Sequence, residues 1–155
     1  MGCNCNNTHN SDYDAGCVCN VVSFIHELQE CASTTPSLYY DIPFLDPHYE
    51  AKTANTRPFV LFTKSGNPFE AYVPSITTNC KSAIFRVENI DDSCYAVLQP
   101  LIVVTNRGED ANLNPICTYL TRPDAVLHAT SSYITLDLTC FCGIQCLRDV
   151  YIPNC

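Results

Sequence analysis

The chain has 155 residues and a formal net charge of −8, with 46% hydrophobic and only 15% charged residues. This length suits one domain with a sizeable buried core. The acidic balance and the shortage of lysine and arginine argue against nucleic-acid binding, which needs clustered cations. A surface so poor in charge is typical of a protein that neighbours largely cover.

The N-terminal segment predicts neither a secretory signal nor a membrane anchor. Residues 1–6 lack the charged and apolar regions of a signal peptide. The most apolar stretch, residues 96–104, is too short to span a bilayer. We therefore expect synthesis in a cytoplasm and no membrane span. Residues 1–16 are polar and without apolar periodicity, which predicts a flexible arm carrying Cys3 and Cys5.

A stripe of apolar residues with helical spacing follows the arm. Its members are Val18, Val21, Val22, Ile25, Leu28 and Ala32. Pro36 and the preceding serine and threonine residues would end such a helix. We expect one amphipathic helix at about 18–32, whose apolar face packs either on its own domain or on a neighbouring subunit.

After a turn-rich stretch at residues 37–57, the hydrophobic period changes to two, which is typical of strands. Strand-like segments occupy residues 58–63, 69–73, 83–88, 94–104 (with a bend at Pro100), 116–120, 125–129 and 133–138. Residues 64–68 have the composition of a hairpin turn. The pattern predicts a mainly β fold: a single antiparallel β-sandwich or jelly-roll-like domain over residues 17–155, with one N-terminal helix.

Twelve cysteines are the most unusual feature of the chain. This density approaches that of disulfide scaffolds, which are usually secreted domains too small to build a core. The present chain is long enough to bury a core without them. Because a cytoplasm keeps thiols reduced, the cysteines either bind metal or oxidise after their compartment changes.

Three pairs have the spacing Cys-x-Cys: Cys3 and Cys5, Cys17 and Cys19, and Cys140 and Cys142. In a strand, residues i and i+2 lie about 6.6 Å apart on one face. That separation is at the upper limit for a disulfide, and the Cβ vectors run parallel. Each sulfur of an extended pair therefore needs a partner in another segment or another molecule.

Metal and catalytic sites find little support in the sequence. Zinc sites usually contain Cys-x-x-Cys pairs or histidines at ligand spacing. The chain has no Cys-x-x-Cys, and its histidines are not so spaced: His9, His26, His48 and His128. A zinc-binding cysteine-rich protein remains the alternative function. No cysteine stands out as a nucleophile, and no phosphate-binding or serine-nucleophile motif occurs. We expect no enzyme, no cofactor and no catalytic, cofactor-binding or metal residues.

Four segments together resemble the CotY/CotZ/ExsY family of bacterial spore-coat and exosporium proteins. They are residues 17–31 (CVCNVVSFIHELQEC), 55–66 (NTRPFVLFTKSG), 84–92 (IFRVENIDD) and 140–149 (CFCGIQCLRD). The closing segment is the most specific of the four, and the resemblance extends over nearly the whole chain.

The resemblance implies a structural protein made in the mother-cell cytoplasm. Such proteins self-assemble into a two-dimensional, commonly hexagonal layer on the endospore surface, in the exosporium base layer or the outer coat. The implied partners are other copies of the chain, as hexamers in an extended lattice, and other coat or exosporium proteins. No secretion signal is needed, because the mother cell builds the layer and then lyses, and its thiols meet oxidant at that time.

We assign the cysteines to three groups on this basis. Mobile termini reach furthest, and a pair at the helix start can hold a neighbour's arm. Candidates for disulfides between molecules are therefore Cys3, Cys5, Cys17, Cys19 and Cys155. Residues expected as either disulfides or free thiols are Cys31, Cys140, Cys142 and Cys146. Expected buried free thiols, acting as small hydrophobes, are Cys80, Cys94 and Cys117.

Overall fold

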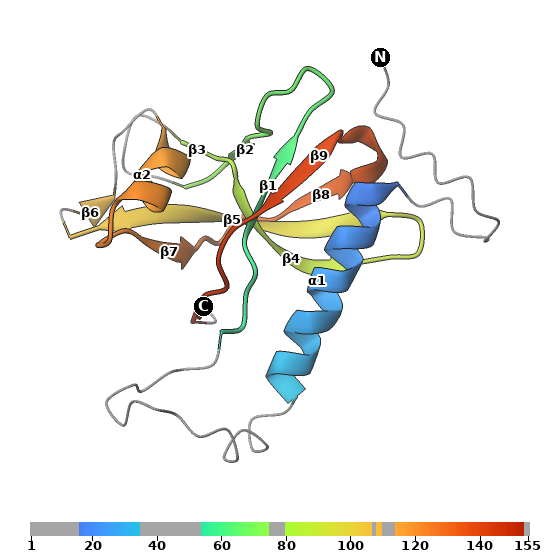
Figure 1. Cartoon of the computed structure of the whole chain (residues 1–155), viewed down its shortest axis with the longest axis horizontal. Coiled ribbons are helices and arrows are strands. Elements are labelled where there is room, and N and C mark those ends of the chain that lie inside the picture. Colours follow the sequence, from blue (N-terminus) through green and yellow to red (C-terminus); the bar gives the residue numbers. More distant parts are fainter. Residues whose placement is uncertain (1–15, 35–53, 75–79, 107, 110–113, 154–155) are drawn as a thin grey trace.

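The computed structural model describes residues 16–34, 54–74, 80–106, 108–109 and 114–153 (Figure 1). The helical elements are α1 (Cys17–Thr34), α2 (Pro115–Thr121) and a 3-10 turn (Leu138–Cys140). The strands are β1 (Phe59–Phe62), β2 (Ala71–Tyr72), β3 (Lys81–Ser82), β4 (Ile84–Ile90), β5 (Tyr95–Thr105), β6 (Gly108–Glu109), β7 (Val126–Ala129), β8 (Ile134–Asp137) and β9 (Gly143–Cys146). The predicted fold class, mainly β with an N-terminal helix, is confirmed.

Seven strands form one antiparallel sheet. Its path is β6-β5-β4-β1-β9, and β7 and β8 also pair with β5. β2 and β3 form a separate two-stranded ribbon. The long strand β5 therefore holds most of the sheet together, since β4, β6, β7 and β8 all hydrogen-bond to it.

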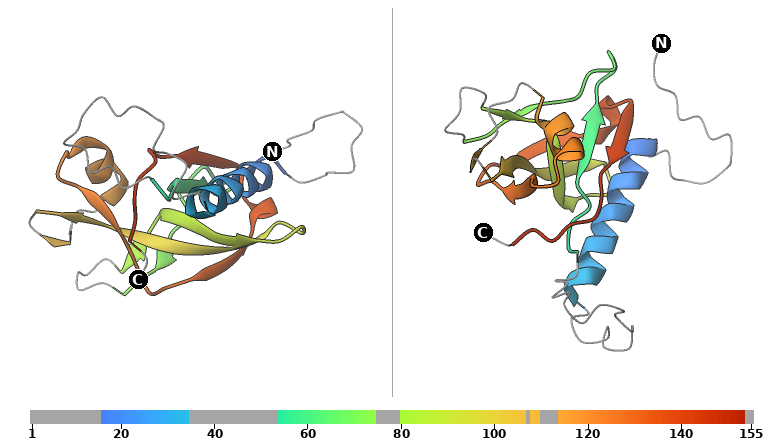
Figure 2. Two further views of the ribbon diagram at one scale, coloured as in Figure 1. Left: turned by 90° about the horizontal axis from the view of Figure 1, so that it is seen from below. Right: turned by 60° about the vertical axis from the view of Figure 1, so that its left-hand side comes forward.

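α1 lies across one face of this sheet (Figure 2). Val18, Val22 and Ile25 recur at helical spacing, and all three are buried in the first of two core clusters. Their partners in that cluster come from β1, β4 and β5. The helix predicted at 18–32 is confirmed, and of the two packing alternatives this face packs on the sheet of its own chain.

Polar contacts fix the C-terminal half of α1 to the same sheet. The side-chain amide of Gln29 donates a hydrogen bond to the Val87 carbonyl of β4 at 2.9 Å. The Gln29 side-chain oxygen accepts one from the backbone N–H of Arg57 at 3.2 Å. One side chain thus bonds a backbone group of β4 and another just before β1, which ties the helix to both segments.

The two faces of the sheet carry separate cores because side chains alternate along each strand. Phe59, Leu61 and Phe85 point to the α1 face, whereas Val60 and Ile84 point to the other. The second core packs against α2 and the C-terminal segment. Its further buried members are Leu101, Val103, Tyr119, Ala125, Leu127, Leu147 and Ile152.

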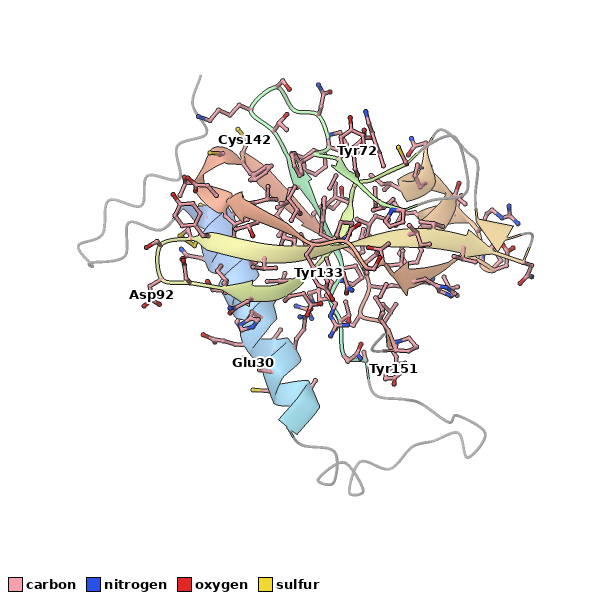
Figure 3. The ribbon with its side chains drawn as sticks, turned by 180° about the vertical axis from the view of Figure 1, so that it is seen from behind. Glu30, Tyr72, Asp92, Tyr133, Cys142 and Tyr151 are labelled. Atoms are coloured by element: carbon pink, nitrogen blue, oxygen red, sulfur yellow. A yellow bond between two sulfur atoms is a disulfide. The ribbon has the colours of Figure 1, made fainter. Side chains whose placement is uncertain are left out.

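Pro100 sits in the middle of β5, where a missing backbone N–H would normally break a ladder. The sheet accommodates Pro100 because β7 and β8, which pair with β5 along the same side, leave a gap beside it. Across that gap the Thr130 hydroxyl donates to the Pro100 carbonyl at 2.7 Å. The Gln99 amide donates to the Thr130 carbonyl at 2.8 Å, and it also lies 3.4 Å from the hydroxyl of Tyr133 (Figure 3). β5 thus runs as one continuous strand through Pro100, beside an interrupted one.

Two further predictions need correction. Residues 116–120, expected as a strand, form α2, because Asn114 caps its N-terminus by accepting from the Cys117 N–H and Pro115 occupies its first position. The hairpin expected between residues 58–63 and 69–73 forms only near its turn, where the Phe69 N–H donates to the Leu61 carbonyl. Beyond the turn, β2 pairs with β3 and not with β1.

The side-chain bridge over Pro100 yields a stability prediction. Thr130→Val keeps the shape of the side chain but leaves the buried Pro100 carbonyl without this partner. We expect a loss of about 1–3 kcal/mol in the free energy of unfolding, measured by urea denaturation. Thr135→Val on the exposed face of β8 is the matched control and should change stability by less than about 0.5 kcal/mol. Equal effects of the two changes would contradict the bridging role.

Candidate functional site: the cysteine sites

One disulfide joins the first turn of α1 to the turn between β4 and β5. Cys19 and Cys94 have Cα atoms 5.6 Å apart and are separated by 75 positions in the chain. Both residues are buried within the first core. The disulfide therefore covalently links the helix to the sheet beneath it.

The turn around Asp91 presents Cys94 to the helix. The Asp91 carboxylate accepts hydrogen bonds from the N–H groups of Ser93 (2.9 Å) and Tyr95 (3.0 Å). Cys94 itself has φ 67°, in the left-handed region that usually favours glycine or asparagine. A left-handed residue after such a turn is common in hairpins, and here that position also directs the sulfur towards α1.

Cys19 and Cys94 differ from what we expected of them. Cys94 is buried, but it is a disulfide partner and not a free thiol. Cys19 bonds within its own chain and does not face a neighbour. The physical reason is that Cys17 and Cys19 lie in a helix, where residues i and i+2 point in different directions, so that Cys17 is exposed and Cys19 is buried.

Two further cysteines of the described segments are also disulfide-bonded. They are Cys17, at the start of α1, and Cys142, immediately before β9. Cys142 lies on the same side of the molecule as the N-terminal end of α1 (Figure 3). Of its two alternatives, Cys142 therefore adopts the disulfide. Cys3, Cys5 and Cys155 lie outside the described residues.

Four cysteines carry free, exposed thiols, and they lie on four different elements. They are Cys80 beside β3, Cys117 on α2, Cys140 in the 3-10 turn and Cys146 on β9. Cys31, on α1, is exposed as well. The expected burial of Cys80 and Cys117 is wrong. Cys117 lies on an outward face of a helix where we expected a strand, and Cys80 borders a two-stranded ribbon that covers little of it.

Cys146 has the most distinctive surroundings of these thiols. Burial raises the pKa of Cys146, the positive charge of Arg57 lowers it, and the negative charge of Asp149 raises it again. The Arg57 guanidinium donates two hydrogen bonds to the Asp149 carboxylate, at 2.7 and 3.0 Å. These bonds hold the pKa of Asp149 below its usual range and raise the pKa of Arg57. The net upward shift makes Cys146 less nucleophilic at neutral pH than an unperturbed thiol, because the thiolate is the reactive form.

No group of three or more histidine, cysteine, aspartate or glutamate side chains that could hold a metal ion occurs among the residues that the structure describes. His26 lies on α1, where its Nε2 is 3.5 Å from Glu30 Oε1. His128 is exposed on β7. Neither histidine lies in such a group.

An antiparallel β domain with a buried disulfide and several exposed thiols defines a cysteine-rich, mainly β protein. The family model described as spore coat protein Z matches residues 1–149, so the chain belongs to that family. The resemblance seen in the sequence is thereby confirmed. Comparison with curated proteins and with solved structures gave no match. Membership gives the chain a structural role in the spore coat, at the spore surface. None of the described helices is both long enough and apolar enough to cross a membrane.

The disulfide between α1 and the sheet yields a second prediction. Replacing both Cys19 and Cys94 by Ala removes a crosslink that closes a long loop in the unfolded chain. We expect a loss of about 2–4 kcal/mol in the free energy of unfolding under non-reducing conditions. The matched control, Cys80→Ala with Cys117→Ala, should change stability little because both thiols are exposed. A loss that persists undiminished when both proteins are measured in reductant would contradict the crosslinking explanation.

The charges around Cys146 yield a third prediction, on the pH dependence of its alkylation by iodoacetamide. Because its pKa is raised, the rate should reach half its maximum at a higher pH than for an unstructured cysteine peptide. Asp149→Asn removes a charge that raises the pKa and should move the midpoint down. Arg57→Gln removes a charge that lowers the pKa and should move it up. Shifts of both variants in the same direction would contradict this electrostatic account.

Proposed function

We propose that this chain is a building block of a two-dimensional, hexagonal layer on the endospore, in the exosporium base layer or the outer coat. In this proposal the chain assembles with copies of itself, first into hexamers and then into an extended lattice. Disulfides between neighbouring molecules then lock the layer. The supporting observation is that Cys80, Cys117, Cys140 and Cys146 carry free thiols on the surface, whereas Cys19 and Cys94 are buried and bonded to each other.

The exposed thiols support crosslinking because they are poorly explained by the stability of the monomer. An exposed cysteine contributes little to a core and invites reaction with other molecules. Four free thiols lie beside β3, on α2, in the 3-10 turn and on β9, so four separate parts of the chain each present one. A unit of a lattice needs at least two kinds of contact with its neighbours, one to close a ring and one to join rings.

The timing of oxidation follows from the compartment. In the mother-cell cytoplasm the thiols stay reduced, so the molecules can assemble reversibly and correct errors. After lysis, each pair of thiols loses two protons and two electrons to an oxidant such as molecular oxygen or a small-molecule disulfide, and one S–S bond forms. The bond makes the layer kinetically stable, because a tied neighbour cannot dissociate. Cys3, Cys5 and Cys155 remain candidates for the same role, and other coat or exosporium proteins remain candidate partners.

The proposal predicts reducible assemblies. Purified protein should form sheets visible by electron microscopy and, after oxidation, a ladder of oligomers on a non-reducing gel that collapses with reductant. Replacing Cys80, Cys117, Cys140 and Cys146 by Ser should leave the fold and the sheets intact but shorten the ladder. Sheets that run as monomers without reductant would contradict the crosslinking. Stoichiometric zinc in the purified protein, with loss of fold in chelator, would favour the zinc-binding alternative.

A further inference from the structure

The strand β9 is the last strand at its end of the sheet. It pairs with β1 along one side, and no strand of the described segments pairs with its other side. The Leu147 N–H donates to the Pro58 carbonyl, and hydrogen-bonding residues alternate along an antiparallel ladder. Gly143 and Gln145 therefore also face β1. The backbone N–H and C=O groups of Ile144 and Cys146 point away from the sheet.

The side chains that usually protect an edge strand are missing from β9. Natural sheets block their edges with charged residues, prolines or bulges. Residues 143–147 contain no charged residue and no proline, and the β1–β9 register runs without a bulge. Among the described residues, nothing in the sequence or register of this edge opposes pairing with another strand.

A neighbouring part of α1 is apolar and exposed. Phe24 and Leu28 are 54% and 38% exposed, and they lie one turn apart on the same flank of the helix. Leu28 borders a hollow that Arg57 and Asp149 also line, and these are the charges that act on Cys146. α1 packs beside β9 along this side of the molecule (Figure 2). The apolar flank of α1 and the free edge of β9 thus form one surface.

We propose that a second copy of the chain docks on this surface about a two-fold axis, so that the two β9 strands pair antiparallel and extend the sheet across the pair. This inference rests on the proposed layer and names one of its contacts. With the axis at Gln145, Ile144 of each copy lies opposite Cys146 of the other. All the outward backbone groups of both residues then find partners, in four hydrogen bonds.

The same axis brings the two helices together. A two-fold axis perpendicular to the sheet keeps both copies of α1 on one face and makes them antiparallel. The flanks carrying Phe24 and Leu28 then face each other across the junction and bury apolar area that is exposed in the single chain. Further members of this flank are also uncharged: Cys17, Val21 and Cys31. Although the chain has a net charge of −8, the flank residues themselves therefore bring no like charges together.

The geometry of the pair provides a direct test. Gln145 is exposed, and in the proposed register it lies opposite its own copy in a non-hydrogen-bonded pair, at a Cα separation of about 4.5 Å. That separation suits a disulfide. Gln145→Cys is introduced into a chain whose exposed Cys31, Cys80, Cys117, Cys140 and Cys146 are replaced by Ser. The matched control is Thr135→Cys, at an exposed position of β8, in the same background.

With oxidised glutathione as the oxidant, we expect the Gln145→Cys variant to form a covalent dimer at least about tenfold faster than the control, because docking raises the effective concentration of the two thiols. Mass spectrometry should show the bond between the two substituted positions. Equal rates for the two variants, or a bond at other positions, would overturn the proposal.

A second measurement tests the helix flank in reducing buffer, without any crosslink. Phe24→Lys should raise the dissociation constant of the dimer at least about tenfold in sedimentation velocity, since apolar anchors at the centre of an interface carry most of its affinity. Leu120→Lys, at a 57% exposed position on α2, is the control and should have a much smaller effect. An equal effect of both changes would contradict the placement of α1.

The two proposals fail in different ways. Sheets and reducible ladders without a crosslink at position 145 would leave the layer supported and would place its contacts elsewhere. A specific dimer without sheets or longer ladders would support this interface and contradict the layer.

Discussion

The burial of β5 on both of its faces is the constraint on which the rest of the structure depends. Ala96 and Leu98 in its first half belong to the core beneath α1, whereas Leu101 and Val103 in its second half belong to the core beneath α2. Four other strands of the sheet pair with this one strand. An interruption of β5 would therefore affect both cores, whereas the gap beside Pro100 lies between β7 and β8.

The two cores also explain how the cysteines can serve different purposes. Aliphatic and aromatic side chains fill most of both clusters, so folding does not depend on the exposed thiols. Cys19 and Cys94 strengthen a contact that Val18, Val22 and Ile25 already make. In the proposed layer, the thiols on the surface make the contacts with other molecules. The proposed crosslinking after oxidation is therefore compatible with a chain that folds before it.

Much of the fold was predictable because its signals are local. The apolar stripe of α1, the alternation in β4 and β5 and the turn at residues 64–68 each lie within a short window. α2 was missed because a five-residue apolar run resembles a strand, although Asn114 and Pro115 signal a helix start. β9 was missed because its residues, Gly143 to Cys146, include one β-branched side chain and have little alternation.

The sequence by itself determined the fold class, the N-terminal helix and the family, since these depend on the spacing of apolar residues and on short motifs. The tertiary structure decided which cysteines are buried, bonded or exposed. Cys-x-Cys spacing implies separate partners for the two sulfurs, but it does not identify them. The partner of Cys19 lies 75 positions away, and the pairing of β4 with β5 beneath α1 brings it within bonding distance. Such a contact depends on the packing of whole elements, which no local pattern contains.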